Sequence, residues 1–378
     1  IAGLLECGYP LADARDYCFA GCIEIFIPGK QGPWGDDRLN PLHAVSLALF
    51  RGRDILTGNQ LGPDTGEPLD FESFYQAFLT HAKREARLKI EDWNRRQKEA
   101  DDKAMELTAP LLSALVSDCI GRGRDVNDGG AIYPANCGFG CMGIGSISDS
   151  LAAMKKFVYD EKRFTLDQMR AMLEAEFEGY EKERQLLINS APKYGNDDKE
   201  VDSIAVRFVT EFAGSFKEFR TPGGGHYWLL MAANINNIWG GSVIGATPDG
   251  RHARLPLSDS ASPTFGRDKN GPTSTARSIA KLPYYLCAGG NVVNMKLSPA
   301  SLKGEEGLKN LACFVRAAFD MGAVQLQFNT NDRELLRKAM ANPGEYANLV
   351  VRVSGFSSKF TTLDKAVQED ILSRTEHN

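Results

Sequence analysis

The alternation of helix-like and strand-like segments in the second half of the chain constrains its fold more than any other feature. Residues 311–322 and 332–340 carry apolar side chains at the spacing of amphipathic helices, and the short apolar runs 323–329 and 349–353 have the length of strands. One more helix is predicted close to the C-terminus. Helices that alternate with short strands are typical of α/β proteins, so the sequence predicts an α/β fold.

The first half of the chain predicts mostly helix, so strands are expected to be few there. A serine and an aspartate at the start of 146–162 are placed to cap a helix. Helices are predicted at 40–50, 69–107, 110–120, 146–162, 165–189 and 199–219, and alternating residues at 226–238 suggest a strand.

Charge and cysteine content narrow the classes of partner and compartment. The chain of 378 residues has a net charge of −5 with both signs well mixed, which argues against nucleic acid or an anionic membrane as its main partner. No apolar run approaches the length of a membrane span. Eight cysteines are too few for a disulfide scaffold, so reduced thiols in a cytoplasm are expected. Because the chain begins with Ile1, it is expected to be the C-terminal part of a longer protein.

The segment FAGCIEIF, residues 19–26, places the Cys22 thiol two positions from the Glu24 carboxylate among apolar side chains. The nearest histidine in sequence is His43, so no local base is available to activate the sulfur. A free cysteine is often simply a small core residue. A buried glutamate is costly unless it is paired or used, so packing alone does not explain this segment.

The segment CGFGCMGIG contains G-x-G-x-x-G at Gly138, Gly140 and Gly143, the spacing of a dinucleotide-binding turn. That turn needs a strand in front of it, and the preceding AIYPAN is short and contains a proline. A glycine-rich loop that caps a helix is therefore favoured over the alternative, an NAD-dependent oxidoreductase.

Two C-x₃-C pairs, Cys18 with Cys22 and Cys137 with Cys141, have a spacing found in structural zinc sites. Structural zinc is needed chiefly where a core is small, and this chain has ample core. Zinc would also leave Glu24 without a role. We therefore predict no metal site.

The segment LVVRVSGFSSKF, residues 349–360, suggests a second interpretation of Cys22. Gly355 alone would be an ordinary glycine at a strand end. Together with the cysteine segment, however, this stretch resembles the glycyl radical enzymes, in which an R-V-S-G-Y/F motif carries a radical glycine and a G-C-x-E loop carries the reacting cysteine. The matching residues are Arg352, Val353, Ser354, Gly355, Phe356, Gly21, Cys22 and Glu24. Interior segments also resemble that family in the same order.

The resemblance implies a fold and a radical relay. The fold would be half of a ten-stranded α/β barrel with surrounding helices, with 1–340 as the barrel part and 341–378 as the glycine radical domain. The cysteine and glycine loops would meet tip to tip. Gly355 would store the radical, Cys22 would pass it to the substrate by hydrogen-atom transfer, and Glu24 would carry a proton. Hydrogen-atom transfer needs no thiolate, which explains the missing histidine.

The resemblance also implies partners. No bound cofactor is expected, because a radical-SAM activase with an iron–sulfur cluster would install the radical. A homodimer and a small-molecule substrate are expected as well. A short repair module that replaces a damaged glycine segment is a different alternative, but such modules do not need the G-C-x-E loop.

The substrate class is predicted from the G-C-x-E loop and the residues that follow it. Cys22 has no adjacent cysteine, unlike pyruvate formate-lyase itself, and the loop resembles the dehydratase branch. The glycerol and diol dehydratases have a W-H-D stretch after this loop, and its aspartate holds a substrate hydroxyl. Trp34 and Asp36 match that stretch, although Gly35 replaces the histidine. Dehydration of glycerol or a 1,2-diol is therefore predicted, with a choline-type C–N or C–S lyase or an arylacetate decarboxylase as alternatives.

The remaining predicted substrate-binding residue comes from the segment 226–238. If its strand-like alternation holds, Asn234 and Asn236 lie on one face of that strand. Asn234 is then predicted to join Asp36 in binding the substrate. A cap or turn role for Asp36 is the alternative.

Overall fold

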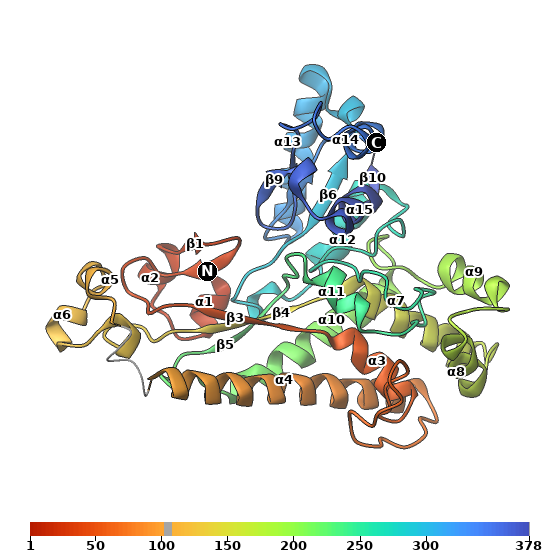
Figure 1. The fold of residues 1–378 in the computed structure, drawn as a ribbon, viewed down its shortest axis with the longest axis horizontal. Coiled ribbons are helices and arrows are strands. Elements are labelled where there is room, and N and C mark those ends of the chain that lie inside the picture. The colour runs from red at the N-terminus through yellow and green to blue at the C-terminus, as the bar shows by residue number, and fades with distance from the viewer. Residues whose placement is uncertain (102–107, 378) are drawn as a thin grey trace.

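Two three-stranded parallel sheets form the centre of the molecule, which confirms the α/β prediction (Figure 1). The computed structural model describes residues 1–101 and 108–377. The first sheet has the order β3 (Gly35–Leu39), β4 (Cys137–Cys141) and β5 (Tyr227–Leu230). The second has the order β10 (Glu376–His377), β6 (Asn294–Leu297) and β7 (Gln327–Asn329).

A single parallel bridge between Met231 and Asn291 joins the two sheets. The Met231 N–H donates to the Gly290 carbonyl at 3.1 Å, and the Val292 N–H donates to the Met231 carbonyl at 2.9 Å. Because Met231 follows β5 and Asn291 precedes β6, the bridge continues one parallel sheet into the next. Five strands, β3 to β7, thus follow one another in chain order across the molecule.

Helices cover this array on its outer side. The long helix α4 (Phe71–Asp101) packs along α3 (Pro41–Leu49) and buries Phe74, Tyr75 and Phe78 in the main core. The other α-helices are α1 (Ala2–Glu6), α2 (Leu11–Arg15), α5 (Pro110–Leu115), α6 (Cys119–Arg122), α7 (Ile144–Met154), α8 (Leu166–Glu174), α9 (Glu181–Ser190), α10 (Lys199–Gly214), α11 (Asn236–Ser242), α12 (Gly271–Ala280), α13 (Gly304–Met321), α14 (Arg333–Ala341) and α15 (Lys365–Ser373).

Two antiparallel hairpins stand apart from the parallel strands. The first pairs β1 (Cys18–Ala20) with β2 (Glu24–Phe26), and the second pairs β8 (Val350–Arg352) with β9 (Ser357–Lys359). In Figure 1 the first lies near the N-terminus and the second in the lobe built from the C-terminal elements.

The first part of the glycine-rich segment is strand β4, so its prediction as a loop was wrong there, whereas Gly143 does stand at the N-terminal cap of α7. Gly138 and Gly140 lie within β4, where every residue is buried. A Cβ on Gly138 would lie 2.6 Å from the Trp34 ring, and one on Gly140 would lie 2.5 Å from the Ala232 carbonyl oxygen. The glycines therefore allow close packing across the sheet, and they do not form the strand-to-helix turn that a dinucleotide site needs.

The predicted caps of the helix at 146–162 were also wrong. Helix α7 begins after Gly143, whose φ of 79° suits glycine, and no side chain caps it. Ser146 is fully buried inside the helix, and its hydroxyl accepts a hydrogen bond from the Ser258 N–H at 2.9 Å. Because α7 is buried on all sides, its serine bonds to a neighbouring segment and not to its own terminus.

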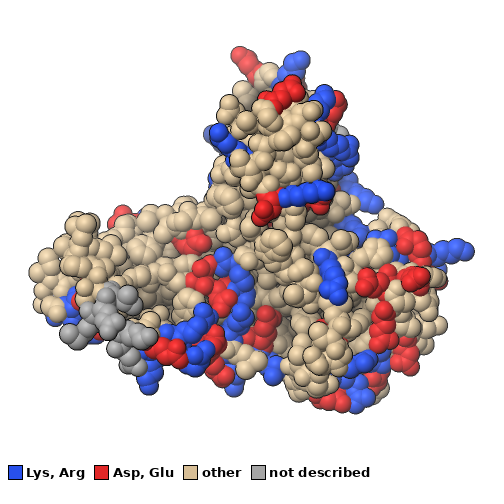
Figure 2. All heavy atoms as spheres, viewed as in Figure 1, with Lys and Arg blue, Asp and Glu red and all other residues tan. Residues whose placement is uncertain are grey.

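The face of the molecule drawn in Figure 2 carries both signs of charge in small groups. No helix within the described ranges is long and apolar enough to cross a membrane. Nor does this part of the chain bring three or more His, Cys, Asp or Glu side chains together as a metal site.

Candidate active site

The tips of the two hairpins meet, as the resemblance implied. Gly355 is buried in the turn between β8 and β9 with a φ of 79°, a conformation that favours glycine. A Cβ added to Gly355 would lie 2.4 Å from the Cβ of Cys22 and 3.1 Å from its sulfur. The Cα–H bond in that position therefore points at Cys22, so a hydrogen atom can pass directly between the two residues.

Cys22 packs, as Trp34 does, against a small apolar cluster that contains Ile23 and Leu230. Burial, and next the charge of Glu24, raises the pKa of the Cys22 thiol above its ordinary value of 9.0. The sulfur thus keeps its hydrogen at neutral pH. That state suits a hydrogen-atom donor and is the opposite of an activated thiolate nucleophile.

Glu24 closes the cysteine turn with its own side chain. Its Oε2 accepts hydrogen bonds from the backbone N–H groups of Cys22 at 2.8 Å and Ile23 at 2.9 Å. Its Oε1 makes no hydrogen bond or ion pair with the described residues and stays available to a ligand. Glu24 and Cys22 are only partly buried in this chain, in contrast to the burial that their apolar neighbours suggest.

If Glu24 has the role that the resemblance implies, we expect Glu24→Gln in the complete protein to lower turnover about 10²-fold or more, because a neutral amide cannot accept a proton from a substrate. The glutamine oxygen can still accept the two backbone hydrogen bonds, so the cysteine turn should persist. Turnover and glycyl radical content are measured on the same activated sample. Unchanged turnover would show that the carboxylate has no proton-transfer role.

Asp36 lies on β3 opposite Gly138 of β4. Its carboxylate forms an ion pair with the Arg38 guanidinium, and its side chain is 37% exposed. The charges of Asp36 and Arg38 both act on the Cys22 thiol, which places them in its vicinity. A substrate hydroxyl at Asp36 would share the carboxylate with Arg38.

The strand predicted for 226–238 ends early, so the shared face for Asn234 and Asn236 was wrong. After the bridge at Met231 the chain leaves the sheet, since the Ala233 N–H donates to the Ser260 hydroxyl at 2.8 Å. Asn236 begins helix α11. Asn234 lies in the connecting loop with a φ of 60°, and its buried Oδ1 has no partner among the described residues.

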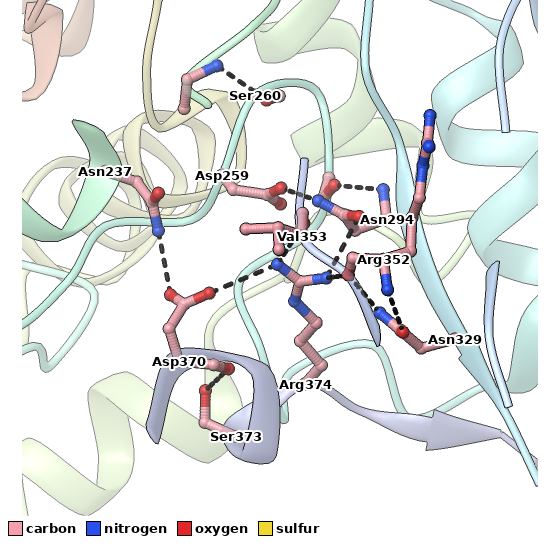
Figure 3. A network of polar contacts seen from close by, with 12 residues as sticks. Asn237, Asp259, Ser260, Asn294, Asn329, Arg352, Val353, Asp370, Ser373 and Arg374 are labelled. Atoms are coloured by element: carbon pink, nitrogen blue, oxygen red, sulfur yellow. Dashed lines mark hydrogen bonds and ion pairs between the residues drawn. The ribbon is translucent and has the colours of Figure 1, made fainter. Parts of the chain in front are cut away.

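Sequence reasoning missed a polar network behind the glycine hairpin (Figure 3). Asn329 accepts a hydrogen bond from the Arg352 N–H at 2.8 Å and donates to its carbonyl at 2.6 Å. Arg374 donates to the Val353 carbonyl at 2.6 Å and to that of Arg352 at 3.1 Å. The signal available was the alternation of polar residues at 325, 327 and 329 in an otherwise apolar strand.

Arg374 is also the counter-charge of a buried acid. It lies 3.5 Å from Asp370, which in turn accepts a hydrogen bond from Asn237 of α11 at 3.0 Å. Burial raises the pKa of Asp370 to about 6, and the Arg374 charge opposes that rise. Arg374 thus links the glycine hairpin to α15 and α11.

Replacing Arg374 by methionine is expected to lower the free energy of unfolding by about 3–5 kcal/mol, because it leaves the buried Asp370 carboxylate without its counter-charge and the Val353 carbonyl without a donor. Denaturant unfolding of the complete protein measures the change. Lys338→Met removes an exposed cation paired within α14 and serves as control, with an expected change below about 0.5 kcal/mol. Equal effects of both substitutions would contradict the anchoring role of Arg374.

Comparison with known proteins identifies the family. Residues 1–241 match the family described as pyruvate formate lyase-like, and residues 257–361 match the glycine radical family. The chain belongs to the glycyl radical enzymes. The second match contains Gly355, so a protein-based glycyl radical, and not a separate bound cofactor, is the redox centre that the family implies.

Relatives of this glycyl radical chain include several lyases. It is 36% identical over 376 residues to trans-4-hydroxy-L-proline dehydratase from Clostridioides difficile, with 99% of the chain and 47% of the relative aligned. It is 33% identical over 383 residues to isethionate sulfite-lyase from Bilophila wadsworthia, covering 98% of the chain and 45% of that protein. The glycerol-bound B12-independent glycerol dehydratase from Clostridium butyricum superposes with a TM-score of 0.95 at 37% identity, covering 99% and 47%. The chain thus spans about half the length of the relatives it matches.

Proposed function

We propose that the complete protein is a glycyl radical dehydratase that removes water from a small hydroxylated substrate such as glycerol or a 1,2-diol. The observation that carries this proposal is the contact of the two hairpin tips, which sets Gly355 against Cys22. The names of the similar hydroxyproline and glycerol dehydratases support dehydration as the reaction class.

The first step exchanges one hydrogen atom. The Gly355 radical takes the hydrogen of the Cys22 S–H bond, which leaves a closed-shell glycine and a thiyl radical on sulfur. The thiyl radical then breaks a C–H bond of the substrate at a carbon that carries a hydroxyl, and the S–H bond forms again. No electron is gained or lost by the protein in these two transfers.

The second step releases water. Glu24 accepts the proton of the hydroxyl on the radical carbon, which makes loss of the neighbouring hydroxyl group easier. That group takes the same proton back from Glu24 and leaves as water, so Glu24 is again a carboxylate and a carbonyl group remains on the product radical. The product radical then takes back a hydrogen atom from Cys22, and Cys22 recovers its own from Gly355. Asp36 and Asn234 are proposed to bind the substrate's hydroxyl groups during this sequence.

We propose three further features of the complete protein. A radical-SAM activase generates the Gly355 radical, two copies form a homodimer, and the protein acts in the cytoplasm. The division of the chain into a barrel part at 1–340 and a glycine radical domain at 341–378 stays a prediction.

A substrate panel tests the reaction class. The complete protein, activated without oxygen by its activase, is incubated with glycerol, 1,2-propanediol, trans-4-hydroxy-L-proline and isethionate, and the products are measured by mass spectrometry. Loss of water from a hydroxylated compound supports the proposal. Sulfite release from isethionate without dehydration of any compound would contradict the proposal. It would favour a C–S lyase reaction, as the name of the similar isethionate sulfite-lyase suggests.

A further inference from the structure

Both peptide groups beside the Cα of Gly355 are held by side chains of the polar network. The Gly355 N–H donates to Oε1 of Gln327 at 3.0 Å, and the Gly355 carbonyl accepts from Nη2 of Arg352 at 3.0 Å. The Nε of Arg352 donates to the same Gln327 oxygen at 2.8 Å. One amide oxygen and one guanidinium thus enclose the glycine in a ring of three hydrogen bonds.

These hydrogen bonds have the polarity that favours a radical on the enclosed carbon. A radical at a glycine Cα is shared with the electron-donating nitrogen on one side and the electron-withdrawing carbonyl on the other. A hydrogen-bond acceptor on the N–H raises the electron-donating power of the nitrogen. A cationic hydrogen-bond donor on the carbonyl oxygen raises the electron-withdrawing power of the carbonyl group. Gln327 and Arg352 supply one of each.

The orientation of the Gln327 amide is fixed by a chain of donors and acceptors that runs away from the glycine. The Gln327 amide nitrogen donates to Oδ1 of Asn294 at 2.5 Å. The Asn294 amide nitrogen donates in turn to the buried Asp259 carboxylate (Figure 3). Arg374, which can only donate, bonds the same Asn294 oxygen at 3.2 Å. These partners turn the oxygen of Gln327 toward Gly355.

We propose that Gln327 is a positioning residue that prolongs the life of the Gly355 radical by accepting the hydrogen bond of its N–H group. This inference rests on the proposed function, because it assumes the radical at Gly355. Gln327 is 6% exposed and lies behind the hairpin on β7, so its effect acts through the glycine peptide.

Gln327→Met tests the inference, since it retains the length of the side chain and removes its hydrogen bonds. In the activated complete protein under argon, we expect the glycyl radical to decay about tenfold faster, the factor that corresponds to one hydrogen bond of about 1.4 kcal/mol. The hyperfine splitting of the electron paramagnetic resonance spectrum should change as well. Gln327→Glu, which still offers an acceptor to the Gly355 N–H, should bring both quantities back toward wild type.

Asn329→Met is the matched structural control. It removes two hydrogen bonds to the backbone of Arg352 but none to Gly355. Its spectrum should keep the wild-type splitting even if the hairpin is less stable. If Gln327→Met does not fold, Asn294→Leu removes the group that orients Gln327 and should change the splitting and the decay in the same direction.

The outcomes separate the inference from the function on which it rests. If the folded Gln327→Met or Asn294→Leu protein shows the same splitting and decay as wild type, the role of Gln327 is overturned and the proposed function is not. A splitting that changes equally in Asn329→Met assigns the effect to general loosening and also overturns that role. An activated wild-type protein without any glycine radical overturns both proposals.

Discussion

Air is expected to cut the activated protein at Gly355. Oxygen adds to a carbon-centred radical, and the product of that addition at a glycine Cα breaks the backbone. The complete protein should therefore release a C-terminal fragment that begins at about Phe356 when it is activated and then exposed to air. Protein that has not been activated should stay whole under the same air. Intact mass spectrometry of both samples measures the fragment.

Gly355→Ala is the control for this cleavage. Its methyl group would lie 2.4 Å from the Cβ of Cys22, at a backbone φ of 79° that alanine adopts only with strain. We expect loss of both the fragment and the turnover. A fragment of the same mass from the activated alanine variant would show that the cut does not depend on a glycine at position 355, and would contradict the account.

Loss of the Cys22 sulfur is expected to separate storage of the radical from its use. In Cys22→Ser the O–H bond is too strong for the glycyl radical to break, so turnover should fall at least about 10³-fold, which corresponds to about 4 kcal/mol of activation free energy. The radical at Gly355 does not depend on the sulfur once it is installed. Its resonance signal and the cleavage in air should both persist.

Cys18→Ser gives the matched comparison, because Cys18 is an exposed thiol on the neighbouring strand β1 of the same hairpin. This variant should retain wild-type turnover. Full activity of Cys22→Ser, or an equal loss in both serine variants, would contradict the assignment of Cys22 as the radical carrier.

Periodicity predicted the helices of this chain better than its strands. The spacing of apolar residues located α3 and α14 to within one residue at each end, but it missed the start of α13 at 304–310, where the side chains are almost all exposed. Strand β4 was missed because its glycines carry no side chain to form a pattern, and the need for glycine comes from Arg38 on β3 and from Trp34 just before it. Such contacts between distant segments leave no local signal.

The residues of the candidate site also differ in how well the sequence predicted them. Cys22, Glu24 and Gly355 were predicted from two short motifs, and the structure brings the cysteine and the glycine into contact. Asn234 was assigned to a strand face that does not exist, because a long-range bond to Ser260 draws the chain out of the sheet. The polar alternation at 325, 327 and 329 marked one part of the network behind the glycine, but its partners could not be predicted, since they come from segments far apart in the sequence.

Isotope labelling of glycine gives the most direct test of where the radical is stored. The complete protein is produced with glycine that carries ¹³C at Cα, activated without oxygen, and compared by electron paramagnetic resonance with unlabelled protein. We predict an additional ¹³C splitting of the organic radical signal in wild type and no signal in Gly355→Ala. A signal without ¹³C splitting, or one that persists in Gly355→Ala, would contradict a radical at Gly355.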